Sequence, residues 1–134
     1  MITSAEEFVA LRGSEVKDEY DRAAMEEAPI SVWREVIEKF PEYRRWVAHN
    51  KTVPVEILEE LCVFDDVRYF VASKRKLSQT LFERLSQDPN SLVRGAIAAN
   101  RKAPIAILEK LLEDESESVV SMARYNFASR KPQS

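Results

Sequence analysis

The chain has 134 residues, of which 45% are hydrophobic and 32% are charged, with a formal net charge of -3. This length and composition fit one soluble domain with a core and a polar surface. The sequence pI of about 5.3 argues against a protein whose main task is to grip phosphate backbones. Two glycines, Gly13 and Gly95, are too few for the many tight turns of a β-sandwich or barrel, which favours an all-α fold.

Residues 1–28 are predicted to form an N-terminal cap of two helices. The segment 3–7, Thr-Ser-Ala-Glu-Glu, contains a capping-box pattern, in which a hydroxyl and a carboxylate three residues later satisfy the first amides of a helix. We expect this helix to run to about Arg12 and to end at Gly13. A second helix is expected from Ser14 to about Glu27.

Four segments of the remaining chain repeat one pattern at intervals of 25, 24 and 26 residues, and they begin at Pro29, Pro54, Ser78 and Pro104. Proline at the first helical position leaves no amide unpaired, and Ser78 can act as an N-cap. Apolar residues then recur three and four positions apart, which predicts a short amphipathic helix. This stripe comprises Ile57, Leu58 and Leu61, then Leu81, Phe82 and Leu85, then Ile107, Leu108, Leu111 and Leu112.

The second half of each segment predicts another short helix. Its apolar stripe comprises Val67, Phe70 and Val71, then Val93, Ala96 and Ile97, then Val119, Met122 and Ala123. Asn50, Asn100 and Asn126 stand at the ends of these halves. Because asparagine follows glycine in its tolerance of the left-handed region, we expect these residues to cap the helices at their C-terminal ends.

Val93, Arg94, Ile97 and Asn100, followed by Pro104, Ile107, Leu108, Leu111 and Asp114, resemble the leucine-rich repeat variant, a HEAT-like helical repeat. The resemblance implies a right-handed α-solenoid of about four helix pairs over residues 29–128, in which one helix of each pair is either α or 3₁₀. Residues 129–134 are expected to form a frayed tail. A member of that family carries an iron–sulfur cluster in a cysteine-rich segment, but Cys62 is the single cysteine here, so the cluster is not carried over.

No arrangement of residues in the sequence indicates catalysis. His49 is the single histidine, Cys62 lies in an apolar stripe, and two glycines do not supply a phosphate-binding loop. We therefore expect a protein that is not an enzyme and that binds no cofactor or metal. The sequence has no secretory signal and no long apolar run, which predicts a cytoplasmic, monomeric protein without a membrane contact.

Basic residues recur around the second half of each segment and are predicted to form a basic ridge for an acidic protein partner. The candidate site residues are Arg45, His49, Lys51, Tyr69, Lys74, Arg75, Lys76, Arg101 and Lys102. The alternative for these cations is a solvated edge. The arginines at positions 44, 68 and 94 are expected instead to pin the loops between helices, with Arg94 bridging to a loop carboxylate. Trp46 is expected in the core and Tyr69 on the surface, beside the cations.

Three functions compete on these observations. The first is a protein-interaction module, for which an immunity protein or antitoxin would be one role. The second is nucleic-acid binding along the basic ridge, with an affinity that falls steeply with salt. The third is a structural scaffold within a larger assembly.

Overall fold

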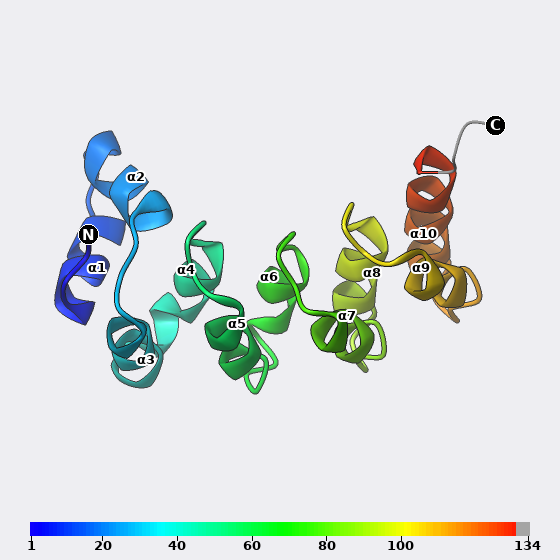
Figure 1. Cartoon of the computed structure of the whole chain (residues 1–134), viewed down its shortest axis with the longest axis horizontal. Coiled ribbons are helices and arrows are strands. Elements are labelled where there is room, and N and C mark those ends of the chain that lie inside the picture. Colours follow the sequence, from blue (N-terminus) through cyan, green and yellow to red (C-terminus); the bar gives the residue numbers. More distant parts are fainter. Residues whose placement is uncertain (131–134) are drawn as a thin grey trace. The chain divides into compact units, whose positions relative to one another are not determined.

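The computed structural model describes residues 1–130, which divide into two compact units, 1–71 and 72–130. The described residues form ten α-helices and one 3₁₀ helix, with no strand, which confirms the all-α class. Unit 1 holds α1 (Ala5–Arg12), α2 (Lys17–Met25), α3 (Ile30–Lys39), η1 (Pro41–Tyr43), α4 (Arg44–His49), α5 (Val55–Leu61) and most of α6 (Arg68–Ala72). Unit 2 holds α7 (Gln79–Leu85), α8 (Ser91–Ala99), α9 (Ile105–Leu111) and α10 (Glu117–Ser129) (Figure 1).

In unit 1, the N-terminal helices pack onto the first repeated segment. The Ser4 hydroxyl accepts a hydrogen bond from the Glu7 amide and so caps α1, as predicted, while Gly13 closes its C-terminal end. The rings of Phe8 and Trp33, both fully buried, meet edge to face with centroids 5.2 Å apart, which fastens α1 to α3. The helix predicted from residue 14 begins instead at Lys17, because Ser14 accepts a bond from the amide two residues on and holds a turn.

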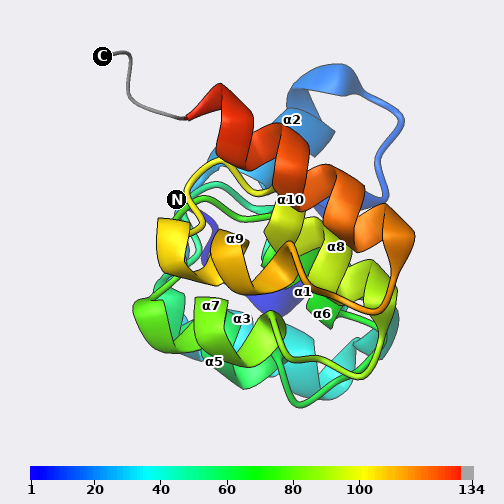
Figure 2. The same cartoon turned by 90° about the vertical axis from the view of Figure 1, so that its right-hand side faces the viewer.

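Unit 2 consists of two helix pairs. The helices α8 and α10 lie side by side and run in the same direction, and α10 also packs on α9 (Figure 1 and Figure 2). The predicted stripe on α7 and α9 is confirmed: Leu81, Phe82 and Leu85, and Ile107, Leu108 and Leu111, are buried. Consecutive helices therefore share an apolar core within the unit.

The prolines stand one position earlier than expected. Pro29, Pro54 and Pro104 are N-caps with extended ψ, and their carbonyl oxygens accept the first intrahelical hydrogen bonds. Ser78 caps α7 as predicted, because its hydroxyl accepts a bond from the Leu81 amide at 3.2 Å.

The predicted asparagine caps are confirmed in position at Asn50 and Asn100, which are the C-cap residues of α4 and α8, but both have extended backbone and not the left-handed conformation expected. No residue among 1–130 has a positive φ, and Asn126 lies inside α10 rather than at its end. The three side chains are buried, and each Nδ2 donates two hydrogen bonds of 2.7–3.0 Å to backbone carbonyls of the preceding pair of helices. Asn50 donates to Ala23 and Glu26, Asn100 to Ala72 and Lys74, and Asn126 to Ala98 and Asn100.

The predicted stripe on the second helices is partly wrong. Val93, Ile97, Val119 and Ala123 are buried, but the middle apolar residue of each set faces outward: Phe70 is 36% exposed and Met122 45% exposed. The α10 helix also continues to Ser129, the first residue of the predicted tail, and 131–134 lie outside the described residues.

Removal of the Asn126 amide is expected to destabilise unit 2. Asn126→Ala leaves two buried carbonyls without their donor, at a cost of about 2–3 kcal/mol in the free energy of unfolding. Urea unfolding followed by circular dichroism measures this change. Asn90→Ala, which removes an exposed cap on the α8 amide of Leu92, is the control and should cost about 1 kcal/mol. Equal losses in the two variants would contradict a special role for the buried amide.

Gly95→Ala is expected to stabilise the protein. Gly95 lies within α8, and a Cβ there would meet Met122 Sδ at 3.5 Å and Val119 Cγ2 at 3.8 Å, which are ordinary contacts. Alanine should therefore raise the free energy of unfolding by about 0.5–1 kcal/mol through its helix propensity. Gly13→Ala is the comparison, because Gly13 follows the last residue of α1 and its added Cβ would lie 3.3 Å from the Val9 carbonyl oxygen. A lower melting temperature for Gly95→Ala would show that α8 and α10 do not tolerate the methyl group.

Candidate functional site

The candidate cations of unit 2 lie in two loops that the structure brings together. Lys74, Arg75 and Lys76 follow α6, and Arg101 and Lys102 follow α8. The Asn100 amide joins the two loops, because its Nδ2 donates to the Lys74 carbonyl at 2.7 Å while its Oδ1 accepts from the Lys102 amide at 2.9 Å.

One further cation belongs to this edge and was not predicted. The Arg130 guanidinium, at the end of α10, donates to the carbonyl oxygens of Arg101 and Ala103. Its position at the start of the expected tail gave no signal of this role. We call Lys74, Arg75, Lys76, Arg101, Lys102 and Arg130 the basic edge of unit 2.

Most cations on this edge have no carboxylate beside them. Within residues 1–130, none of Arg75, Lys76, Arg101 and Lys102 forms an ion pair, and all four side chains are exposed. Cations elsewhere in the chain do pair with carboxylates: Lys17 with Asp21, Arg22 with Glu26, Arg34 with Glu60, and Lys39 with Glu35. Exposed cations without an ion pair in residues 1–130 also occur singly elsewhere, at Arg84 and Lys110 for example, so the basic edge is distinguished by the grouping of four such cations in two adjoining loops.

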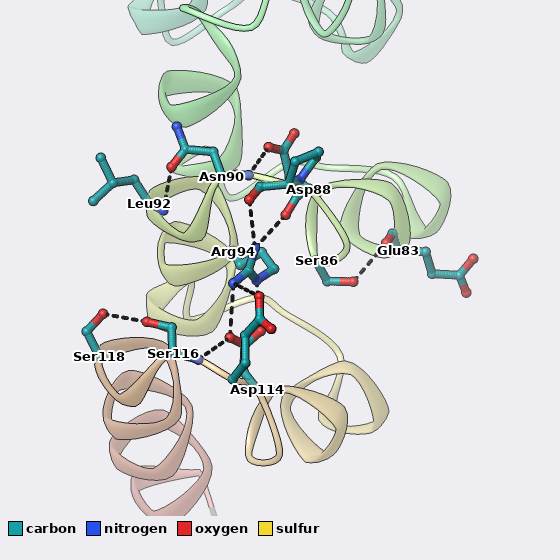
Figure 3. Close-up of polar contacts among 11 residues, drawn as sticks. Glu83, Ser86, Asp88, Asn90, Leu92, Arg94, Asp114, Ser116 and Ser118 are labelled. Atoms are coloured by element: carbon teal, nitrogen blue, oxygen red, sulfur yellow. Dashed lines mark hydrogen bonds and ion pairs between the residues drawn. The ribbon is translucent and has the colours of Figure 1, made fainter.

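The opposite edge of unit 2 is acidic and contains a buried ion pair. Arg94 donates from Nε to Asp114 Oδ2 at 2.8 Å and from Nη1 to the carbonyl oxygens of Asp88 and Pro89 at 2.8 and 3.1 Å (Figure 3). The side chains of Arg94 and Asp114 are only 11% and 9% exposed. The guanidinium thus ties the loop before α8 to the loop before α10.

The pinning role predicted for the three repeat arginines is confirmed, although the acceptors differ from those expected. Arg44 Nε donates to the Ile37 carbonyl and Arg68 Nε to the Cys62 carbonyl, each at 2.8 Å. The carboxylate bound by Arg94 is that of Asp114, which belongs to the following loop rather than to its own. Helix-end carbonyls compete well for a guanidinium because they have no partner within the helix.

In unit 1 the candidate residues gather around Trp46. The Arg12 guanidinium lies 3.5 Å and that of Arg45 4.8 Å from the ring centroid, and the His49 ring meets Trp46 edge to face at 5.6 Å. Trp46 is half-buried rather than in the core as expected, since it stands at the same outward repeat position as Phe70. Two guanidiniums over one indole form cation–π contacts that hold the side chains in place.

The other two candidates of unit 1 lie on separate segments. Lys51 is exposed after α4, where its amide donates to the Ala24 carbonyl at 2.8 Å. Tyr69 is 47% exposed on α6, which confirms its predicted outward position. The structure describes the two units separately, so a single ridge through both remains an expectation.

The Asp114 carboxyl group is expected to make stability depend on pH. The hydrogen bond from Arg94 lowers the pKa of Asp114 below its ordinary value of 3.8, and the Ser116 amide adds to this effect. A lowered folded-state pKa means that the stabilisation is fully present above about pH 5 and is lost as the pH falls through the folded-state pKa.

Asp114→Asn should therefore cost about 3 kcal/mol in the free energy of unfolding at pH 7, and the gap to the unmodified protein should narrow below about pH 4. Urea titrations between pH 2.5 and 7 measure both changes. Glu115→Gln is the control, because that side chain is 91% exposed at 3.8 Å from Arg94 Nη2 and should leave the curve unchanged. If the difference in free energy of unfolding between Asp114→Asn and the unmodified protein did not change with pH, the pH dependence could not be assigned to Asp114.

No group of three or more histidine, cysteine, aspartate or glutamate side chains in residues 1–130 is arranged to hold a metal ion. None of the helices in that same range is long and apolar enough to cross a membrane. Comparison with family models, with curated proteins and with solved structures finds no match to the chain.

Proposed function

We propose that this chain is a non-catalytic protein-interaction module that binds an acidic surface of a partner protein through the basic edge of unit 2. The observation that carries the proposal is the grouping of Arg75, Lys76, Arg101 and Lys102, which form no ion pair within the described residues, in two loops that the Asn100 amide joins. The chain has 23 acidic residues, so carboxylates are available, yet none lies beside these four cations. A partner's carboxylates would complete the pairing.

The charge arrangement favours a protein partner over a nucleic acid. The basic edge has a limited extent, and the opposite ends of α8 and α10 carry Asp88, Glu113, Asp114, Glu115 and Glu117. A long phosphate backbone would meet these carboxylates as well as the cations. Electrostatic complementarity over one small patch instead steers a partner and sets its orientation.

Charge reversal on the basic edge is expected to weaken partner binding without loss of stability. Arg75→Glu combined with Lys76→Glu should weaken capture of a partner from a native-host extract at least about tenfold, because four charge units change at the contact. The full-length tagged chain is used, with nuclease-treated extract at physiological salt, and retained proteins are identified by mass spectrometry.

The matched control is Arg84→Glu combined with Lys110→Glu. Both side chains are exposed, lie on the first helices α7 and α9, and form no ion pair in residues 1–130, so the net-charge change is the same. Equal capture by the two double variants would contradict the proposal. Capture from untreated extract that is absent from nuclease-treated extract would indicate nucleic-acid binding instead, and a lowered melting temperature for the Arg75 and Lys76 variant would make those residues structural.

A further inference from the structure

A hollow of about 650 Å³ lies between the C-terminal end of α8 and the outward face of α10. Ala99 of α8 lines the hollow with only a methyl group, whereas the same repeat position in unit 1 carries His49. The far wall is formed by Met122 and Tyr125 of α10.

We propose that this hollow is the docking site for an acidic segment of the partner protein that carries one bulky apolar side chain. The inference rests on the proposed function and identifies the part of the partner that is bound. Met122 and Tyr125 are 45% and 77% exposed, so a large apolar surface is available inside the hollow. Methionine adapts to the shape of an apolar partner, and exposed tyrosine is enriched at binding hot spots.

Cations line one end of the same hollow. Arg101 and Arg130 belong both to the hollow and to the basic edge, which makes the two surfaces continuous. Arg130 is held in place by its bonds to the Arg101 and Ala103 carbonyls, so its charge is fixed before binding. The complementary ligand therefore places carboxylates at this end and its apolar side chain over Met122.

The length of the hollow suits a short peptide. Its lining on α10 extends from Ser121 to Arg130. At about 1.5 Å per residue, this stretch of helix covers roughly 13 Å, and about four residues of an extended chain span the same distance. The volume also lies within the usual range of about 300–1,000 Å³ for ligand sites.

The test uses a fluorescein-labelled synthetic peptide, Glu-Glu-Phe-Glu-Glu, titrated into the full chain labelled with ¹⁵N. We expect amide shift changes at Ala99, Ser121 and Ser129. A matched peptide with serine in place of phenylalanine, and another with glutamine in place of glutamate, should each bind at least about tenfold more weakly. Shift changes confined to the Arg75 loop, or equal binding of the serine peptide, would overturn the proposal.

Ser121→Trp fills the hollow and should weaken peptide binding about tenfold or more. Ser121 is exposed, so the larger side chain does not disturb the core, and Tyr125→Ser provides a second variant that removes apolar surface without adding bulk. The control is Arg124→Trp, which is exposed on the same helix but outside the hollow. Arg124→Trp also removes a positive charge, which would itself weaken binding of an acidic peptide. Retained affinity in this variant therefore shows that bulk and charge outside the hollow have little effect on binding. Unchanged affinity in both Ser121→Trp and Tyr125→Ser would overturn the proposal.

The same variants separate this inference from the proposed function in the capture experiment. Loss of the partner with the Arg75 and Lys76 double reversal, but not with Ser121→Trp, would leave the proposed function standing and overturn the docking site. Loss with Ser121→Trp alone would support the hollow and contradict the basic edge, and loss with both supports both. A single-stranded oligonucleotide that shifts the hollow amides at lower concentration than the peptide would assign the hollow to nucleic acid and overturn the proposal.

Discussion

The buried side-chain amides of Asn50, Asn100 and Asn126 satisfy a requirement that the backbone of this chain cannot meet alone. The last carbonyls of a helix have no intrahelical donor, and in many helices a left-handed glycine closes them. This chain has two glycines, and no residue among 1–130 has a positive φ. The helix ends therefore receive their donors from the next segment, where each Nδ2 bonds to two carbonyls. Without the amides, those carbonyls would be buried without partners, at a cost comparable to the whole contribution of a core side chain.

The same bonds decide where charges lie in unit 2. The Asn100 amide holds the loop after α6 against the loop after α8, and its Oδ1 orders the turn that carries Lys102. At the other ends of the helices, Arg94 joins the loops that carry Asp88 and Asp114. Because α8 and α10 run in the same direction, the loops that follow the second helices lie on one edge of unit 2. The loops that precede α8 and α10 lie on the other edge (Figure 1). The segregation of charge thus follows from repeating one helix pair with the same loop chemistry.

The sequence predicts the features that depend on local pattern and misses those that depend on a neighbour. The all-α class, the α7 and α9 stripes, the Ser4 and Ser78 caps and the pinning arginines follow from spacing and side-chain chemistry within one segment. The sequence places Asn50 and Asn100 at helix ends, but it does not predict the bonds that the buried amides form, because their acceptors lie 24 to 28 residues away. Trp46 and Met122 were placed in the core because apolar spacing on a six- to thirteen-residue helix does not tell its buried face from a half-exposed one. The sequence did contain one signal of the asparagine bonds, because asparagine recurs two residues after a buried alanine, at Ala48 and Ala98. The corresponding position after the buried Ala72 is occupied by lysine.

Net charge is a poor guide to what this surface can bind. The nine residues of α8 span roughly 13 Å between the acidic and basic edges, and the Debye length at physiological salt is about 8 Å. A partner at one edge is therefore largely screened from the charges at the other, so the total of -3 averages two surfaces that act separately. At the basic edge the relevant quantities are the local cations, the fixed position of Arg130 and the adjoining apolar hollow. Exposed ion pairs contribute about 0–1 kcal/mol each, so the four unpaired cations cost the fold little, whereas several of them acting together on one partner can set both its rate of arrival and its orientation.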